Sequence, residues 1–180
     1  MKRLLNILSV AIIATMFLTG CASVKVIDYV GISPEMVPEK FFDGQLTAHG
    51  IVKNRTGKVT RYFNAEIKAF WKGSIGTLEE DFIFDDGEKQ RRVWTLTRHN
   101  DGSYIGTAGD VVGDAKGKVA GNSMFLKYVL TVPYGDGTIN LVIDDRMYLV
   151  NPNTLINESE MRKFGLNVGQ IILVIRKQQS

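Results

Sequence analysis

The chain has 180 residues, 44% of them hydrophobic, and a formal net charge of +3 at pH 7. Its charged residues form no long block of one sign and no basic stripe interleaved with aromatic residues. This excludes the usual electrostatic signature of nucleic-acid binding, so we expect no nucleic-acid partner. Cys21 is the only cysteine, which excludes a disulfide within the chain.

The first twenty residues have the layout of a secretory signal. Lys2 and Arg3 form a short basic head, and an apolar run follows from Leu4 to Phe17. This run is shorter than the roughly 20 apolar residues that a membrane-spanning helix needs. The pattern predicts a removable signal peptide over residues 1–20. Its removal leaves 160 residues with a net charge of +1, a length that fits one domain.

The end of this segment, Leu18-Thr19-Gly20-Cys21, matches the lipobox of bacterial lipoproteins. In that pathway the thiol of Cys21 receives a diacylglycerol, a peptidase cuts before it, and the new amino group receives an acyl chain such as palmitate. Several acyl chains anchor a protein stably, because each buried methylene contributes about 0.8 kcal/mol. Ala22 follows, whereas Asp at that position favours inner-membrane retention in enterobacteria. We predict lipidation of Cys21 and an outer-membrane lipoprotein that faces the periplasm.

Residues 21–40 contain Pro34 and Pro38 and show no clear hydrophobic period, so we expect a lipidated, extended tether there. From Phe41 onward, apolar residues recur at every second position between short turn sequences, which is typical of an antiparallel β meander. The predicted strands cover residues 46–52, 59–71, 75–84, 90–98, 103–107, 124–132, 138–143, 146–150, 155–156 and 168–175. The glycine-rich residues 106–121 are expected to form twisted or bulged strands.

One short helix is predicted near the C-terminus, over Asn157–Lys163. Asn157 would cap its first turn, acids come early and bases late, and Gly165 would end it. Together these elements predict an all-β domain over residues 41–180, a single antiparallel meander β-barrel of about eight to ten strands. Eight strands are the number at which a barrel interior can hold one small ligand.

Four segments carry a resemblance to a known family, namely Phe41–Gly44, Asp85–Trp94, Gly106–Gly113 and Lys163–Gly165. On these segments the chain resembles a family of proteobacterial lipoproteins known as domain of unknown function 3833. The resemblance implies a lipoprotein that faces the periplasm and has a calycin-like, or lipocalin-like, barrel. It implies no activity and no functional residues.

The sequence contains no motif for catalysis or metal binding. His49 and His99 are the only histidines, and neither lies in a ligand spacing such as His-Glu-x-x-His. The acidic groups 79–81 and 144–145 could supply paired carboxylates, whereas residues 85–86 precede a glycine and are better explained as turn residues. We expect no catalytic residues, no metal and no other cofactor.

The strand over residues 90–98 contains the strongest candidate site. Arg92, Trp94 and Arg98 share one of its faces. An interior arginine suits the carboxylate or phosphate of a ligand, which it binds through two nitrogens. Glu80, on the preceding strand, offers an internal partner. We therefore select Arg92, Trp94, Glu80 and Arg98 as ligand-binding candidates. The alternatives are a structural Glu80–Arg92 ion pair inside a packed barrel, or a solvent-filled end of the barrel.

Two functional hypotheses follow from these patterns. The first is a binding protein whose barrel holds a fatty acid, a lysophospholipid or a similar amphiphile next to the membrane to which its lipid anchors it. The second is a structural or assembly factor of the envelope that has a filled barrel and a protein partner. A third class, an enzyme that acts on lipids, would need polar groups and a base to meet in an open cavity.

Overall fold

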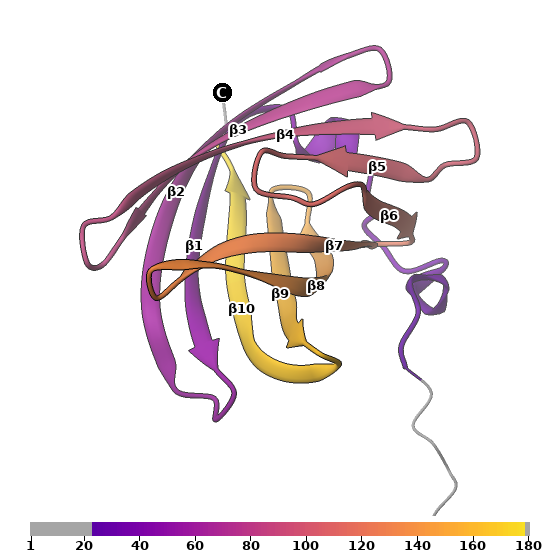
Figure 1. The fold of residues 1–180 in the computed structure, drawn as a ribbon. Coiled ribbons are helices and arrows are strands. Elements are labelled where there is room, and N and C mark those ends of the chain that lie inside the picture. The colour runs from indigo at the N-terminus through magenta and orange to yellow at the C-terminus, as the bar shows by residue number, and fades with distance from the viewer. Residues whose placement is uncertain (1–22, 179–180) are drawn as a thin grey trace, which may run out of the picture.

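The computed structural model describes residues 23–178, whose ten strands form a closed barrel (Figure 1). Each strand pairs antiparallel with the next one in the chain, and β1 pairs with β10 to close the barrel. The strands are β1 (Gly44–Asn54), β2 (Val59–Lys72), β3 (Ile75–Phe84), β4 (Lys89–Arg98), β5 (Tyr104–Thr107), β6 (Ala115–Ala120), β7 (Ser123–Tyr134), β8 (Gly137–Asn151), β9 (Thr154–Lys163) and β10 (Leu166–Lys177). The predicted all-β meander barrel is confirmed. Cys21 and the predicted signal peptide lie outside the described residues.

The alternation of side chains along β2 shows why this sequence forms a barrel wall. Phe63, Ala65, Ile67 and Ala69 are buried in the interior, while the residues between them face solvent. A strand that buries one face and exposes the other needs this period of two. The strands wind steeply around the barrel, so that β7 and β8 cross in front of β1 and β10 (Figure 1).

The helix predicted over Asn157–Lys163 is wrong, because these residues belong to β9. They pair with β8 on one side and β10 on the other. Leu155, Asn157 and Ser159 are buried, while Ile156 and Glu158 between them are exposed. The inward residues Asn157 and Ser159 are polar, which hid the hydrophobic period of this strand. The short helices of the structure instead lie near the N-terminus.

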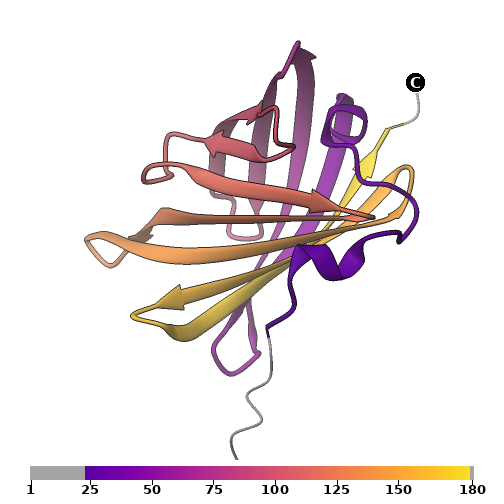
Figure 2. The same cartoon turned by 90° about the vertical axis from the view of Figure 1, so that its right-hand side faces the viewer.

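Residues 23–43 lie against the barrel, although the sequence predicted an extended tether over most of them. The segment contains a 3-10 helix, η1 (Val26–Tyr29), and an α-helix, α2 (Pro38–Phe41). The ring of Tyr29 packs on Tyr148, with centroids 5.4 Å apart, and Met36 N donates a hydrogen bond to Gly121 O. Figure 2 shows η1 beside the barrel and α2 at one of its ends. No helix within residues 23–178 has the length and apolar character to cross a bilayer.

The two ends of the barrel differ. At one end, which we call the closed end, α2 covers the interior with the buried side chains of Phe41 and Phe42. Trp71 Nε1 donates a hydrogen bond of 2.7 Å to Phe42 O and holds this cover in place. The opposite end, which we call the mouth, includes the β3–β4 and β7–β8 turns. Because the strand pairing and the core lie within residues 23–178, this part of the chain folds as one unit.

Candidate functional site

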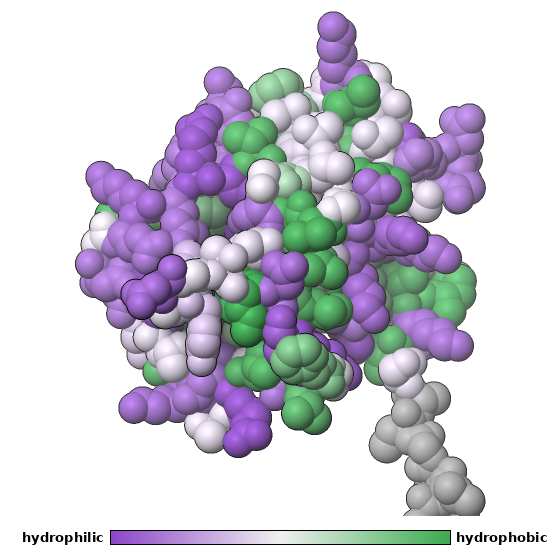
Figure 3. All heavy atoms as spheres, viewed as in Figure 1, coloured by the Kyte–Doolittle hydropathy of each residue, from purple (hydrophilic) through white to green (hydrophobic). Residues whose placement is uncertain are grey.

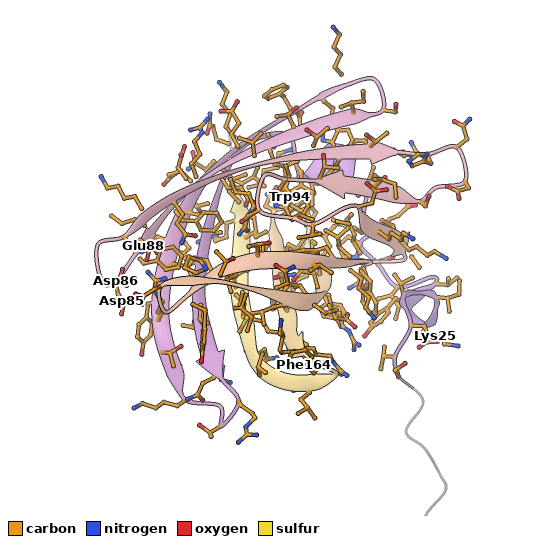
Figure 4. The ribbon with its side chains drawn as sticks, in the orientation of Figure 1. Lys25, Asp85, Asp86, Glu88, Trp94 and Phe164 are labelled. Atoms are coloured by element: carbon orange, nitrogen blue, oxygen red, sulfur yellow. The ribbon has the colours of Figure 1, made fainter. Side chains whose placement is uncertain are left out.

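The interior of the barrel holds a cavity of about 140 Å³. Most of its lining is apolar, and Trp94 lies in this interior space (Figure 4). The buried apolar residues of the lining include Ala48, Ile67, Leu78, Leu96, Leu126 and Ile175. Binding pockets for whole drug-sized ligands measure roughly 300–1,000 Å³. The inner cavity therefore accommodates one part of such a molecule.

A larger cleft, of about 910 Å³, opens at the mouth. Four residues line both the cleft and the inner cavity, namely Phe63, Phe82, Arg92 and Ile171. The cleft is also largely apolar, with Phe84, Leu130, Val132, Leu141 and Met161 among its lining residues. The shared residues form the boundary between the inner cavity and the cleft, and we call this boundary the neck.

A polar cluster interrupts the apolar lining of the inner cavity. It comprises Tyr128 from β7, Asp145 from β8, and Asn157 and Ser159 from β9. The Tyr128 hydroxyl donates to Asp145 Oδ2 at 2.9 Å, and the Ser159 hydroxyl donates to Asn157 Oδ1 at 3.0 Å. Asp145 Oδ1 and Asn157 Nδ2 are buried and have no hydrogen-bond partner among the described residues. Leaving such an atom unpaired costs about 1–3 kcal/mol, so both atoms call for a further partner in the cavity.

Arg92 stands at the neck, between two carboxylates. The pairing of β3 with β4 places Glu80 opposite Arg92, yet their nearest charged atoms are 3.9 Å apart. Asp110, from the loop between β5 and β6, makes the shorter contact. Nε and Nη2 of Arg92 both donate to its carboxylate, at 2.7–3.1 Å. The guanidinium of Arg92 is therefore already neutralised by a bidentate partner within the protein.

Burial sets the protonation of the acids in the cavity. It raises the pKa of Glu80 to about 7, against the attraction of Arg92, which lowers it. Burial likewise raises the pKa of Asp145, although the neighbouring polar side chains of Ser159, Tyr128 and Asn157 oppose this effect. The pKa of Tyr128 also lies well above its usual value, because of burial and the neighbouring Asp145. Glu80 therefore changes its charge near neutral pH.

Three of the four residues selected from the sequence line the cavity, namely Glu80, Arg92 and Trp94. The ring of Trp94 packs edge-on against Tyr128, with centroids 5.3 Å apart. Arg98 lies elsewhere, at the closed end, where its side chain is 56% exposed and its Nε lies 3.6 Å from Glu39 Oε1. A strand rises about 3.3 Å per residue, so the six steps from Arg92 to Arg98 carry Arg98 out of the site although both residues share a face.

The sequence did not single out Asp110, Tyr128, Asn157 or Ser159 as site residues, and Asp145 stood out only as part of an acidic pair. A signal for Asp145 was present, because it occupies an inward position in an otherwise apolar series of alternate residues. That series is Leu141, Ile143, Asp145, Met147 and Leu149. Within residues 23–178, no three His, Cys, Asp or Glu side chains are grouped so as to hold a metal ion.

The sequence matches one family model, described as a protein of unknown function (DUF3833), over residues 15–177. The chain belongs to this family. The match spans the whole barrel and agrees with the resemblance seen in four of its segments. No curated relative matches the sequence.

Several solved structures resemble the barrel of this DUF3833 protein. One is the S-type phycobiliprotein lyase CPES from Guillardia theta, with a TM-score of 0.50 and 14% identity over 81% of this chain and 94% of that chain. A redesigned β-barrel matches with a TM-score of 0.42 and 9% identity, over 81% of this chain and all of that one. The odorant-binding protein OBP1 matches with a TM-score of 0.36 and 12% identity, over 82% and 78% of the two chains. At 14% identity the similarity to the lyase shows a shared fold alone.

Proposed function

We propose that this protein binds an elongated, mainly apolar small molecule, such as a lipid or another amphiphile, inside its barrel. The observation that carries the proposal is an apolar inner cavity with a buried polar cluster, which shares the residues of its neck with an apolar cleft at the mouth. Ligand sites often lie in the mouths of β-barrels. The inner cavity takes one end of the molecule, and the cleft takes the remainder.

Ile171 offers a test of this path, because it lines both the inner cavity and the cleft. The substitution Ile171→Trp would block the neck. Its matched control is Ile172→Trp, whose side chain points to the other face of β10. Each protein is purified from its native host, extracted, and analysed by mass spectrometry for stoichiometric small molecules.

We expect an amphiphile to accompany the unaltered protein and Ile172→Trp, and its occupancy to fall at least tenfold in Ile171→Trp. An unaltered protein without any bound small molecule, together with no saturable binding of added amphiphiles, would refute the proposal. That result would favour the envelope assembly factor with a protein partner.

The proposed location is the periplasmic face of the outer membrane, to which lipid on Cys21 would anchor the chain. The described segment next to Cys21 has an apolar surface that supports this location. Val24, Ile27 and Val30 are 46%, 62% and 64% exposed, and Figure 3 shows apolar side chains on the right-hand side of the molecule, where η1 lies. Such a surface beside a lipid anchor fits a segment that lies at a membrane interface.

The substitution Cys21→Ser tests the anchor. We expect the unaltered protein to incorporate a palmitate analogue supplied to the cells, and Cys21→Ser to lose this label and the outer-membrane association. Ala22→Asp is the matched control, because it keeps the acceptor thiol and should be labelled but retained in the inner membrane. Equal labelling of Cys21→Ser and the unaltered protein would contradict lipidation at this residue.

A further inference from the structure

The polar cluster of the inner cavity contains one hydrogen-bond acceptor and one hydrogen-bond donor that have no partner among the described residues. The Tyr128 hydroxyl donates to Asp145 Oδ2, and the Ser159 hydroxyl donates to Asn157 Oδ1. The acceptor Asp145 Oδ1 and the donor Asn157 Nδ2 are left without partners. Asp145 is 8% exposed and Asn157 4% exposed, so bulk water does not satisfy these atoms. A group that complements both must itself carry a donor and an acceptor.

The charges around the cavity oppose an anionic ligand. Arg92 is the only cation among the lining residues of the inner cavity. Two nitrogens of its guanidinium already donate hydrogen bonds to the carboxylate of Asp110. Glu80 and Asp145 face the same space, so carboxyl groups outnumber the guanidinium. An added carboxylate would lie against Asp145 in a medium of low polarity, where like charges repel strongly.

We propose that the end group held at Asp145 and Asn157 is uncharged and carries both a hydrogen-bond donor and an acceptor, as a carboxamide or a hydroxyl does. This inference rests on the proposed binding function and specifies the chemical class of the ligand. Asp145 Oδ1 accepts the donor of this group, and Asn157 Nδ2 donates to its acceptor. The apolar body of the ligand extends past Phe63, Phe82 and Ile171 toward the mouth. A fatty-acid carboxylate, which the sequence suggested as a partner of Arg92, does not fit this arrangement.

A series of probes with the same apolar chain tests the inference on residues 22–180, which contain the complete barrel. Decanamide and 1-decanol carry a donor and an acceptor, methyl decanoate lacks the donor, and decanoate is ionised at about pH 8. Binding is measured by calorimetry and by the fluorescence of Trp94, which packs on Tyr128 in the cavity. We expect decanamide and 1-decanol to bind at least tenfold more tightly than either methyl decanoate or decanoate.

The substitution Asp145→Asn identifies the residue that rejects the anion. It removes the negative charge while keeping the size of the side chain, so the preference for decanamide over decanoate should fall at least fivefold. Asp144→Asn is the matched control, because Asp144 is the neighbour on β8 that pairs with Arg146 instead of lining the cavity. The control should keep the full preference.

The outcomes separate this inference from the function on which it rests. If decanoate or methyl decanoate binds as tightly as decanamide, the cavity does not discriminate between end groups, and Asp145 Oδ1 and Asn157 Nδ2 form their hydrogen bonds with water. Only the inference is then overturned. If no probe binds, the proposed function and the inference fail together. The probe series on the unaltered protein decides the inference even if Asp145→Asn does not fold.

Discussion

The substitution Glu80→Gln should stabilise the barrel above neutral pH and leave its stability nearly unchanged in acid. Burial raises the pKa of Glu80 from 4.5 to about 7. Between these two values the folded protein keeps a proton that the unfolded chain has released. The stability that this proton confers is complete below about pH 4.5 and is lost as the pH rises through about 7. Glutamine resembles the protonated acid at every pH, so the variant avoids this loss.

The size of the effect follows from the pKa of the folded state. At roughly 1.36 kcal/mol per pKa unit, a rise from 4.5 to about 7 corresponds to about 3 kcal/mol in the free energy of unfolding. The side chain of Glu80 is only 14% exposed, so solvent screens little of this energy. Above neutral pH, Glu80→Gln should therefore be more stable than the unaltered protein by up to about 3 kcal/mol.

Urea unfolding of residues 22–180, followed by circular dichroism across the pH range, measures this difference. The stability of the variant minus that of the unaltered protein is the informative quantity, because the other titrating groups cancel in it. Glu79→Gln is the matched control on the same strand, since Glu79 points outward and pairs with Arg91. A difference that stays constant with pH, or a variant that is less stable in alkali, would refute the reasoning.

The substitution Asp110→Asn should raise the affinity for decanoate at least tenfold in calorimetry, because it frees Arg92 from its bidentate partner; an unchanged affinity would contradict this role. Gly121→Ala should destabilise the fold by more than about 1 kcal/mol and speed hydrogen exchange in residues 26–36, because its φ is +52° and the added Cβ would overlap Tyr29 O. Gly113→Ala is its control, since φ is +70° but nothing lies near the added atom. Equal hydrogen exchange in both variants would contradict the role of Gly121 in packing residues 26–36 against the barrel.

Strands with alternating apolar residues could be predicted from the sequence, because a strand shows its buried face within a few neighbouring residues. The sequence also showed that Arg92 and Trp94 share a face and placed Glu80 beside them, since all three belong to one hairpin. It could not separate Arg98 from this group, because residues that share a face can still lie at opposite ends of a long strand.

The error at β9 has a physical cause that concerns the site itself. Glu158, Met161 and Arg162 favour a helix in isolation, but pairing with β8 and β10 overrides this local preference. The hydrophobic period was missing because Asn157 and Ser159 occupy inward positions. Polar residues where a core is expected weaken local patterns, and functional sites are where such conflicts are expected.

The sequence by itself determined the meander of strands and which residues of β4 share a face, because both depend on residues close together in the chain. Tertiary structure alone decided which charges meet. The path of one loop brings Asp110 to Arg92, and the pairing register of β7, β8 and β9 sets Asp145 beside Tyr128 and near Asn157. These contacts changed the expected ligand from an anion to an uncharged polar group, since they show that Arg92 is already neutralised and that the free hydrogen-bonding atoms lie deeper in the barrel.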